Sequence, residues 1–212
     1  MMFVHYSIDD VVGVFEELTK KQPDSIFELP FFAHLQHLHN KYGLVVSCYC
    51  FFRNGCFSLA NCTRYYKTEF ERNSSWLRFG FHGYTGCENY EIQALDKSIC
   101  QYRKVICNLR DIVGEKSLDT FPRIHTFRAS RDFLRYLADN DILSLKGVLA
   151  ADDDRISYSL TFSENEELKH QGILIKDNLC ILKTSQRFDG LGLRMQKKLF
   201  SHMGGACYSV YA

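Results

Sequence analysis

The stretch "LVVSCYCFF", residues 44–52, is apolar at almost every position and carries no charge. A strand that is apolar on both faces is typical of a parallel sheet that helices cover on both sides. The preceding stretch, residues 30–43, has the spacing of an amphipathic helix bounded by Pro30 and Gly43. The sequence therefore predicts an α/β fold with parallel strands.

The same alternation of strands and helices continues along the chain. Strands are expected at residues 2–8, 44–52, 76–83, 120–127, 146–151, 172–175, 179–182 and 206–212, and helices at 11–19, 30–43, 64–75, 90–113, 130–140, 164–170 and 191–203. The pattern fits an open doubly wound sheet or a closed or nearly closed barrel. No G-x-G-x-x-G sequence and no P-loop is present, which removes the commonest reason to favour the open sheet.

Length and charge restrict the kind of protein this can be. The 212 residues suffice for one domain, residues 1–212, and the formal net charge of +1 excludes a broad basic field for nucleic acid or an anionic membrane. No apolar run approaches the roughly 18 residues of a membrane span, and no leader pattern precedes the first strand, so a cytoplasmic location is expected. The nine cysteines contain no C-x-x-C pair and are expected to be reduced thiols. A zinc knuckle built from Cys48, Cys50, Cys56 and Cys62 is the weaker alternative.

Polar side chains gather where three of the predicted strands end. Asp9 and Asp10 follow the first strand, His82 ends the strand at 76–83, and Arg123 and His125 share one face of the strand at 120–127. The carboxyl ends of parallel strands meet at one edge of a sheet or one mouth of a barrel. A carboxylate and two imidazoles brought together there are a ligand set for a divalent metal, with zinc the foremost candidate.

Each of these residues also has a purely structural interpretation. A single histidine near a strand end is commonly a hydrogen-bonded structural group, and a helix N-cap would explain one of the two aspartates. It would not explain both, because adjacent carboxylates at a buried strand end repel each other unless a cation compensates them. A metal ion bound by one aspartate and Arg123 paired with the other would meet this requirement.

Three segments resemble the polysaccharide deacetylase family, the NodB-homology proteins: "SIDD" at residues 7–10, "FHGYTG" at 81–86 and "PRIH" at 122–125. The resemblance extends from the first strand to about "DDDR", residues 152–155, and is strongest to a small branch of the family. It implies a distorted (β/α)7-type barrel with parallel strands. It also implies that Asp9 is the catalytic base, that Asp10 and His82 are metal ligands, and that Arg123 orients the base.

The sequence departs from the family pattern at two places. The second ligand histidine of the family lies four residues after the first, where this chain has Gly86. We expect His125 to supply the missing imidazole from the next strand. The family also has a histidine on its last strand as general acid, whereas here the last histidine, His202, falls in the predicted helix at 191–203.

The resemblance implies a metal-dependent hydrolase that removes an acetyl group from a carbohydrate. The acidic segment after the strand at 146–151 is either a solvated loop or a lining of the substrate site, and the candidate substrate-binding residues are Tyr84, Asp152, Asp154 and Arg155. One alternative is a catalytically degenerate barrel that binds carbohydrate or a protein partner without turnover. Another is a glycoside hydrolase, which would need a second acid, Asp152 or Asp153, within about 5 to 10 Å of Asp9.

Overall fold

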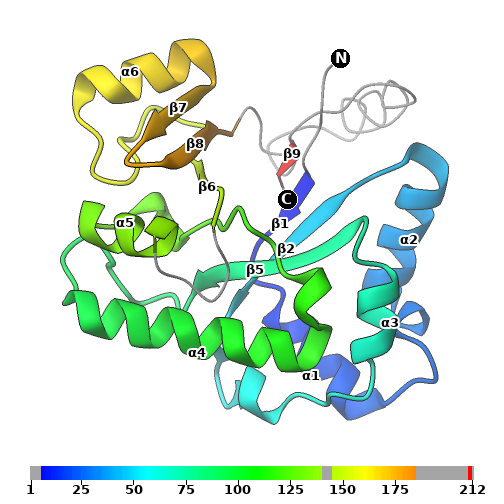
Figure 1. Ribbon diagram of the computed structural model, residues 1–212. Coiled ribbons are helices and arrows are strands. Elements are labelled where there is room, and N and C mark those ends of the chain that lie inside the picture. Colours follow the sequence, from blue (N-terminus) through cyan, green and yellow to red (C-terminus); the bar gives the residue numbers. More distant parts are fainter. Residues whose placement is uncertain (1–5, 140–144, 185–209, 212) are drawn as a thin grey trace.

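A computed structural model describes residues 6–139, 145–184 and 210–211 of the chain. Helices and strands alternate over most of this length, as the sequence predicts (Figure 1). The elements are β1 (Tyr6–Ile8), α1 (Val12–Lys21), α2 (Pro30–Tyr42), β2 (Val46–Phe51), β3 (Arg53–Asn54), β4 (Phe57–Ser58), α3 (Lys67–Arg72), β5 (Leu77–Gly83), α4 (Leu95–Val113), α5 (Arg131–Asp139), β6 (Gly147–Ala150), α6 (Phe162–Gln171), β7 (Ile173–Lys176), β8 (Leu179–Lys183) and β9 (Val210–Tyr211).

The central sheet has the strand order β5-β2-β1-β9, and every pair in it is parallel. All six residues of β2 are buried, which confirms the strand that its two apolar faces predict. Ile8 at the end of β1 pairs with Cys48 in β2, and Cys48 pairs with Phe79 in β5. All three strands therefore point to the same edge of the sheet, and β2 and β5 extend beyond the end of β1 to the pair formed by Phe51 and Gly83.

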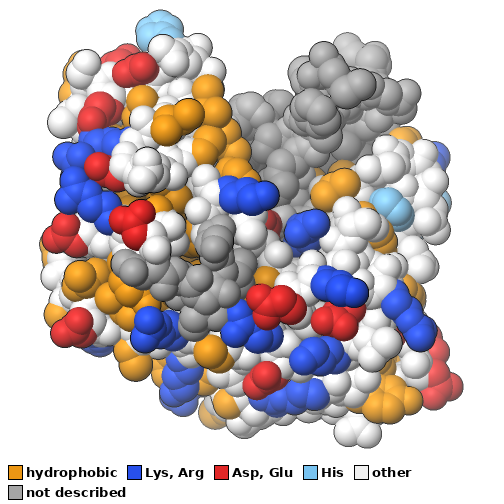
Figure 2. All heavy atoms as spheres, viewed as in Figure 1, with side chains coloured by type: hydrophobic (Ala, Val, Ile, Leu, Met, Phe, Trp, Pro, Cys, Tyr) orange, Lys and Arg blue, Asp and Glu red, His pale blue; other side chains and the backbone are white. Residues whose placement is uncertain are grey.

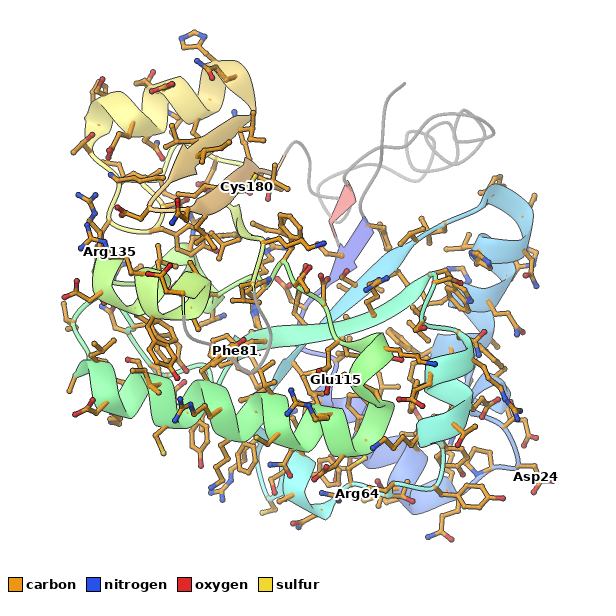
Figure 3. All side chains as sticks on the ribbon, in the orientation of Figure 1. Asp24, Arg64, Phe81, Glu115, Arg135 and Cys180 are labelled. Carbon is orange, nitrogen blue, oxygen red and sulfur yellow. The ribbon has the colours of Figure 1, made fainter. Side chains whose placement is uncertain are left out.

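Helices α1 and α4 lie below the central sheet in the view of Figure 1, and α2 and α3 lie to its right. Phe81 of β5 contacts Tyr102 of α4, with ring centroids 5.1 Å apart (Figure 3). Farther along the sheet, the rings of Phe15, Phe70 and Phe79 pack edge to face or tilted at 5.1 to 6.1 Å. Packing of this kind fixes the sheet rigidly, because each buried aromatic ring removes a large apolar area from water.

A second sheet has the order β6-β8-β7, with β6 and β8 parallel and β7 and β8 antiparallel. The extended segment 118–122 connects the two sheets through backbone hydrogen bonds. Asp119 N donates to Phe79 O at 2.8 Å on one side, and Leu149 N donates to Pro122 O at 3.0 Å on the other. The fold is therefore α/β with a parallel sheet. Among the described residues, the strands do not close into a barrel.

The prediction of a strand at residues 120–127 is wrong. Residues 118–122 are hydrogen bonded only at isolated positions, and His125–Phe127 form a 3-10 turn in which Thr126 has a φ of 59°. Pro122 has no N–H to donate to a neighbouring strand, and a positive φ reverses the direction of the chain. His125 therefore reaches the sheet edge from a turn.

The longest helix begins later than predicted. Helix α4 starts at Leu95, because the backbone before it folds into a turn in which Ile92 N and Gln93 N donate to Asn89 O. Ile92 is 81% exposed and contributes nothing to the core. The other predicted helices lie within a few residues of those observed, except that the helix predicted at 191–203, which contains His202, lies outside the described residues. Of the strand predicted at 206–212, Val210–Tyr211 form β9.

Acidic and basic side chains are interspersed on the face shown in Figure 2, which agrees with the near-zero net charge. Over the part of the chain that the structure describes, no helix combines the length and the apolar character needed to cross a bilayer.

Candidate catalytic site

The two adjacent aspartates occupy different environments just beyond the end of β1. The side chain of Asp9 is 22% exposed, whereas that of Asp10 is 65% exposed. Asp10 has a φ of 60°, a left-handed conformation that aspartate tolerates better than most residues. The N-cap of α1 is Val11 and makes no side-chain capping bond, so neither aspartate serves as its N-cap. The reversal at Asp10 directs the chain away from the strand and into α1.

His82 is buried near the end of β5, and its ring orientation is fixed. Its Nδ1 lies 2.6 Å from the carbonyl oxygen of Arg123, which can only accept, so Nδ1 carries the proton and donates it. The lone pair of Nε2 therefore faces the aspartates, 3.6 Å from Asp10 Oδ1 and 3.9 Å from Asp9 Oδ2. Burial lowers the pKa of His82 to about 4, so the ring is neutral at pH 7.

Arg123 is 5% exposed and pairs with the first aspartate. Its Nη1 lies 3.2 Å from Asp9 Oδ2, and its guanidinium group lies 5.0 Å from the centroid of the Phe127 ring. The buried cation compensates the charge of Asp9 and holds this carboxylate in place. This is the pairing that the sequence predicts for one of the two aspartates.

His125 completes the cluster from the turn that follows Arg123. Its Nδ1 lies 3.1 Å from His82 Nε2, and the two rings meet edge to face with centroids 5.0 Å apart. With the proton of His82 on Nδ1, this hydrogen bond is donated by His125. The five residues that the sequence singles out at the strand ends thus lie together at one edge of the sheet.

Phe51 belongs to the same cluster, although the sequence analysis did not select it. Its ring contacts those of His82 and His125, with centroids 4.8 and 5.1 Å apart. A Cβ added at Gly83 or Gly86 would lie 2.9 or 3.2 Å from this ring. The glycines that follow His82 in "FHGYTG" were the available signal, because glycine in a strand end often marks the close approach of another group.

The same contact explains why residue 86 cannot carry the second histidine of the deacetylase pattern. Gly86 has a φ of +85°, and the space where its side chain would begin is bounded by the Phe51 ring. A side chain there would strain the backbone and displace the ring. In this chain, the imidazole beside His82 is that of His125.

The donor chemistry of the cluster fits a divalent metal ion. His82 has the arrangement of many metal-binding histidines, in which one ring nitrogen donates to a carbonyl and the other offers a lone pair. Without a metal this lone pair accepts the hydrogen bond from His125 Nδ1, so both rings would bind one ion only if the His125 proton lay on Nε2. Asp10 Oδ1 and His125 Nδ1 lie 3.6 and 3.1 Å from His82 Nε2, and two donors on one zinc ion are roughly 3.3 Å apart. Among the described residues, however, no group of three or more His, Cys, Asp and Glu side chains forms a ready metal cage, and this includes the cysteines considered for a zinc knuckle.

The four candidate substrate-binding residues are more dispersed. The Tyr84 ring stacks on Phe52 at 4.9 Å, and its hydroxyl accepts a hydrogen bond from Lys104 Nζ at 3.1 Å. Asp154 is 97% exposed and pairs with Lys169. Asp152 is partly buried in the same loop. Arg155 lines an open groove of about 1000 Å³.

No protein-family model matches the chain, and no curated protein matches it. A comparison with solved structures found a crystal structure of Aspergillus clavatus Sph3 in complex with GalNAc. It is 10% identical to this chain with a TM-score of 0.44, and the match covers 99% of this chain and 88% of that one. This likeness is distant.

Proposed function

We propose that the protein is a metal-dependent hydrolase that removes an acetyl group from a carbohydrate. The observation that carries this proposal is the position of Asp9, held by the buried cation of Arg123 beside the neutral Nε2 of His82. A carboxylate fixed by arginine next to a neutral imidazole at a sheet edge is suited to abstracting a proton from water. The backbone hydrogen bonds through residues 118–122 support the further proposal that the two sheets belong to one distorted (β/α)7-type barrel.

Three side chains would hold the metal: Asp10, His82 and His125. Zinc matches this mixture of carboxylate and imidazole donors best. A bound divalent ion would supply Lewis acidity at the acetyl carbonyl and would lower the pKa of a coordinated water. Asp9 is left to act as the base, because its carboxylate is already paired with Arg123.

The proposed reaction adds one water molecule across the bond between the acetyl carbon and the sugar nitrogen or oxygen. Asp9 takes one proton from the water, and the water oxygen bonds to the acetyl carbon. The bond to the sugar then breaks, acetate is released, and the proton held by Asp9 goes to the leaving nitrogen or oxygen. Arg123 would hold Asp9 in place before the transfer, while the Phe51 ring packs against the two imidazoles.

Metal content and acetate release, measured together, test the proposal. The wild-type protein is expected to contain zinc or a related ion and to release acetate from acetylated xylan or chitin oligosaccharides. Asp9→Asn is expected to keep the metal and to lose about 10² to 10⁴ in rate. Asp10→Asn and His82→Ala are expected to lose both the bound metal and the release of acetate. Asp24→Asn, in an exposed loop far from the cluster, is the matched control (Figure 3). Full metal content in a protein with both Asp10 and His82 replaced would overturn the ligand assignment.

A second candidate, a carbohydrate-binding protein without turnover, is favoured by the closed position at Gly86. Without a histidine at position 86, a metal site would depend on His125 for its second imidazole. Binding of acetylated oligosaccharides by the metal-loaded protein, without acetate release, would establish this alternative in place of the hydrolase.

A further inference from the structure

An open groove of about 1000 Å³ begins beside the catalytic cluster. Thr126, the residue after His125, is part of its lining, as are Arg128 and Arg155. The Phe127 ring separates the two sites, with the guanidinium of Arg123 5.0 Å from its centroid and that of Arg155 5.6 Å from it. A ligand in the groove would therefore lie next to the turn that carries His125.

Left-handed backbone occurs in two lining residues of the groove, Thr126 and Ser159, and in their neighbours Phe127 and Tyr158. Thr126, Phe127, Tyr158 and Ser159 have φ between 53° and 59°. The two segments hold each other in place, since Tyr158 N donates to Phe127 O at 2.8 Å and the Ser159 hydroxyl lies 3.0 Å from the carbonyl oxygen of Ala129. Strained residues of this kind are often found at ligand sites, where they present groups in a preorganised arrangement.

The charged side chains of the groove differ in whether a hydrogen bond or an opposite charge pairs with them. Arg155 makes a two-pronged ion pair with Asp153, at 2.7 Å from Nε and 2.6 Å from Nη2. Glu91 Oε1 accepts a hydrogen bond from Ser159 at 3.1 Å. Arg128 is exposed and makes no hydrogen bond, ion pair or ring contact with any of the described residues. One guanidinium group is thus available to an anion from solution.

We infer that this groove is a substrate subsite that selects a sugar bearing a single carboxylate, such as a uronic acid. The planar fork of Arg128 matches a carboxylate, and Glu91, Ser159 and Thr126 offer partners for sugar hydroxyls. The two arginines and two acids of the lining sum to zero charge, which disfavours a polyanion. The carbohydrate identity of the ligand rests on the proposed function, whereas the preference for a carboxylate rests on the groove.

Calorimetric binding of one matched ligand pair tests this inference. The ligands are a xylotriose that carries one glucuronate branch and the methyl ester of the same oligosaccharide, which lacks the negative charge and carries one more methyl group. We expect the acid to bind at least tenfold more tightly than the ester. Arg128→Gln should weaken the binding of the acid about tenfold, because one charged hydrogen-bond donor is lost, and should change the affinity for the ester little. Arg72→Gln, an exposed arginine on α3, should leave both affinities unchanged.

His82→Ala separates this inference from the proposed function. It should abolish acetate release but keep the preference for the acid, because the groove does not depend on the imidazole. Equal affinities for acid and ester, an unchanged affinity in Arg128→Gln, or no binding of the acid would overturn the inference. A protein that prefers the acid but never releases acetate would support the proposed subsite and contradict the proposed hydrolase activity.

Discussion

At the residue scale, the two adjacent aspartates are separated by what surrounds each of them. Asp9 is partly buried and paired with Arg123, while Asp10 lies in a left-handed conformation with most of its side chain in solvent. Two like charges side by side are tolerated when one has a buried cation and the other has water or a metal ion. The sequence predicted that Arg123 would pair with one of the two aspartates, because no single structural interpretation accounted for both carboxylates, and this pairing is observed. The role of Asp10 as a metal ligand stays a prediction.

Replacement of Arg123 should reveal how strongly Asp9 depends on it. Arg123→Met keeps the apolar contact with Phe127 but leaves Asp9 without its cation, so we expect a loss of about 2–4 kcal/mol in the free energy of unfolding. Urea denaturation at pH 7 measures this loss. Arg155→Met is the matched control, because Arg155 faces the same ring but makes an exposed ion pair, which should cost less than about 1 kcal/mol. Equal losses of stability in the two variants would show that the buried ion pair contributes no more to the free energy of unfolding than the exposed one.

Gly86 offers a second test at single-residue resolution. Gly86→His restores the deacetylase pattern in the sequence, yet it should gain no metal affinity and should lose about 1–2 kcal/mol of stability. The reasons are the φ of +85° and the Phe51 ring 3.2 Å from the new Cβ. Gly86→Ala should lose a similar amount, and zinc titration of both variants completes the comparison. A clear rise in zinc affinity for the histidine variant would contradict the structural account of this position.

At the scale of elements, the sequence was most informative where burial is strong. The apolar run at 44–52 could only be a covered strand, and the punctuation by Pro30 and Gly43 marked both ends of α2. The errors fell on residues 120–127 and on the start of α4, where Pro122 and local hydrogen bonds around Asn89 decide the conformation. Apolar spacing carries no information about such turns.

The N-terminus of α6 should make the stability of this helix sensitive to acid. Thr161 and Glu164 form a capping box, and Glu164 also pairs with Lys176 of β7. The Lys176 side chain, followed by the Thr161 backbone, lowers the pKa of Glu164 from its ordinary value of 4.5 to about 2. A carboxyl group whose pKa is lowered in the folded state stabilises that state at pH values above its ordinary pKa. This stabilisation is lost as the pH falls from about 4.5 towards 2.

Thermal unfolding at pH 7, 4 and 3 in Glu164→Gln measures the effect. The variant should be less stable than the wild type at pH 7 by about 1 kcal/mol, because Glu164 is partly exposed, and the difference should shrink as the pH falls. Glu167→Gln, an exposed position on the same helix, is the control and should show no such convergence. A difference between wild type and Glu164→Gln that stays constant down to pH 3 would contradict the assignment.

At the scale of the whole molecule, the topology brings together residues that are far apart in sequence. Residues 9, 82 and 123 meet because β1, β2, β5 and the segment at 118–122 are neighbours in hydrogen-bonding order. The parallel arrangement, and with it this gathering, followed from the apolar strands. The turn at His125 could not be predicted from apolar spacing, and Phe51 was indicated only indirectly, by the glycines after His82, because its role depends on packing across the sheet end.

Zinc binding should stabilise the whole fold, because the proposed ligands come from β1, β5 and the turn at 125–127. At a zinc concentration 100-fold above the dissociation constant, binding contributes about 2.7 kcal/mol, which corresponds to a rise of roughly 5 to 10 °C in the melting temperature. Thermal scans of chelator-treated protein, with and without zinc, should show this rise in the wild type and in Asp9→Asn. The rise should be lost in His82→Ala and reduced in His125→Ala, since each removes one proposed donor. A rise of equal size in His82→Ala would place the bound zinc elsewhere and would remove the physical basis for treating Asp10, His82 and His125 as one site.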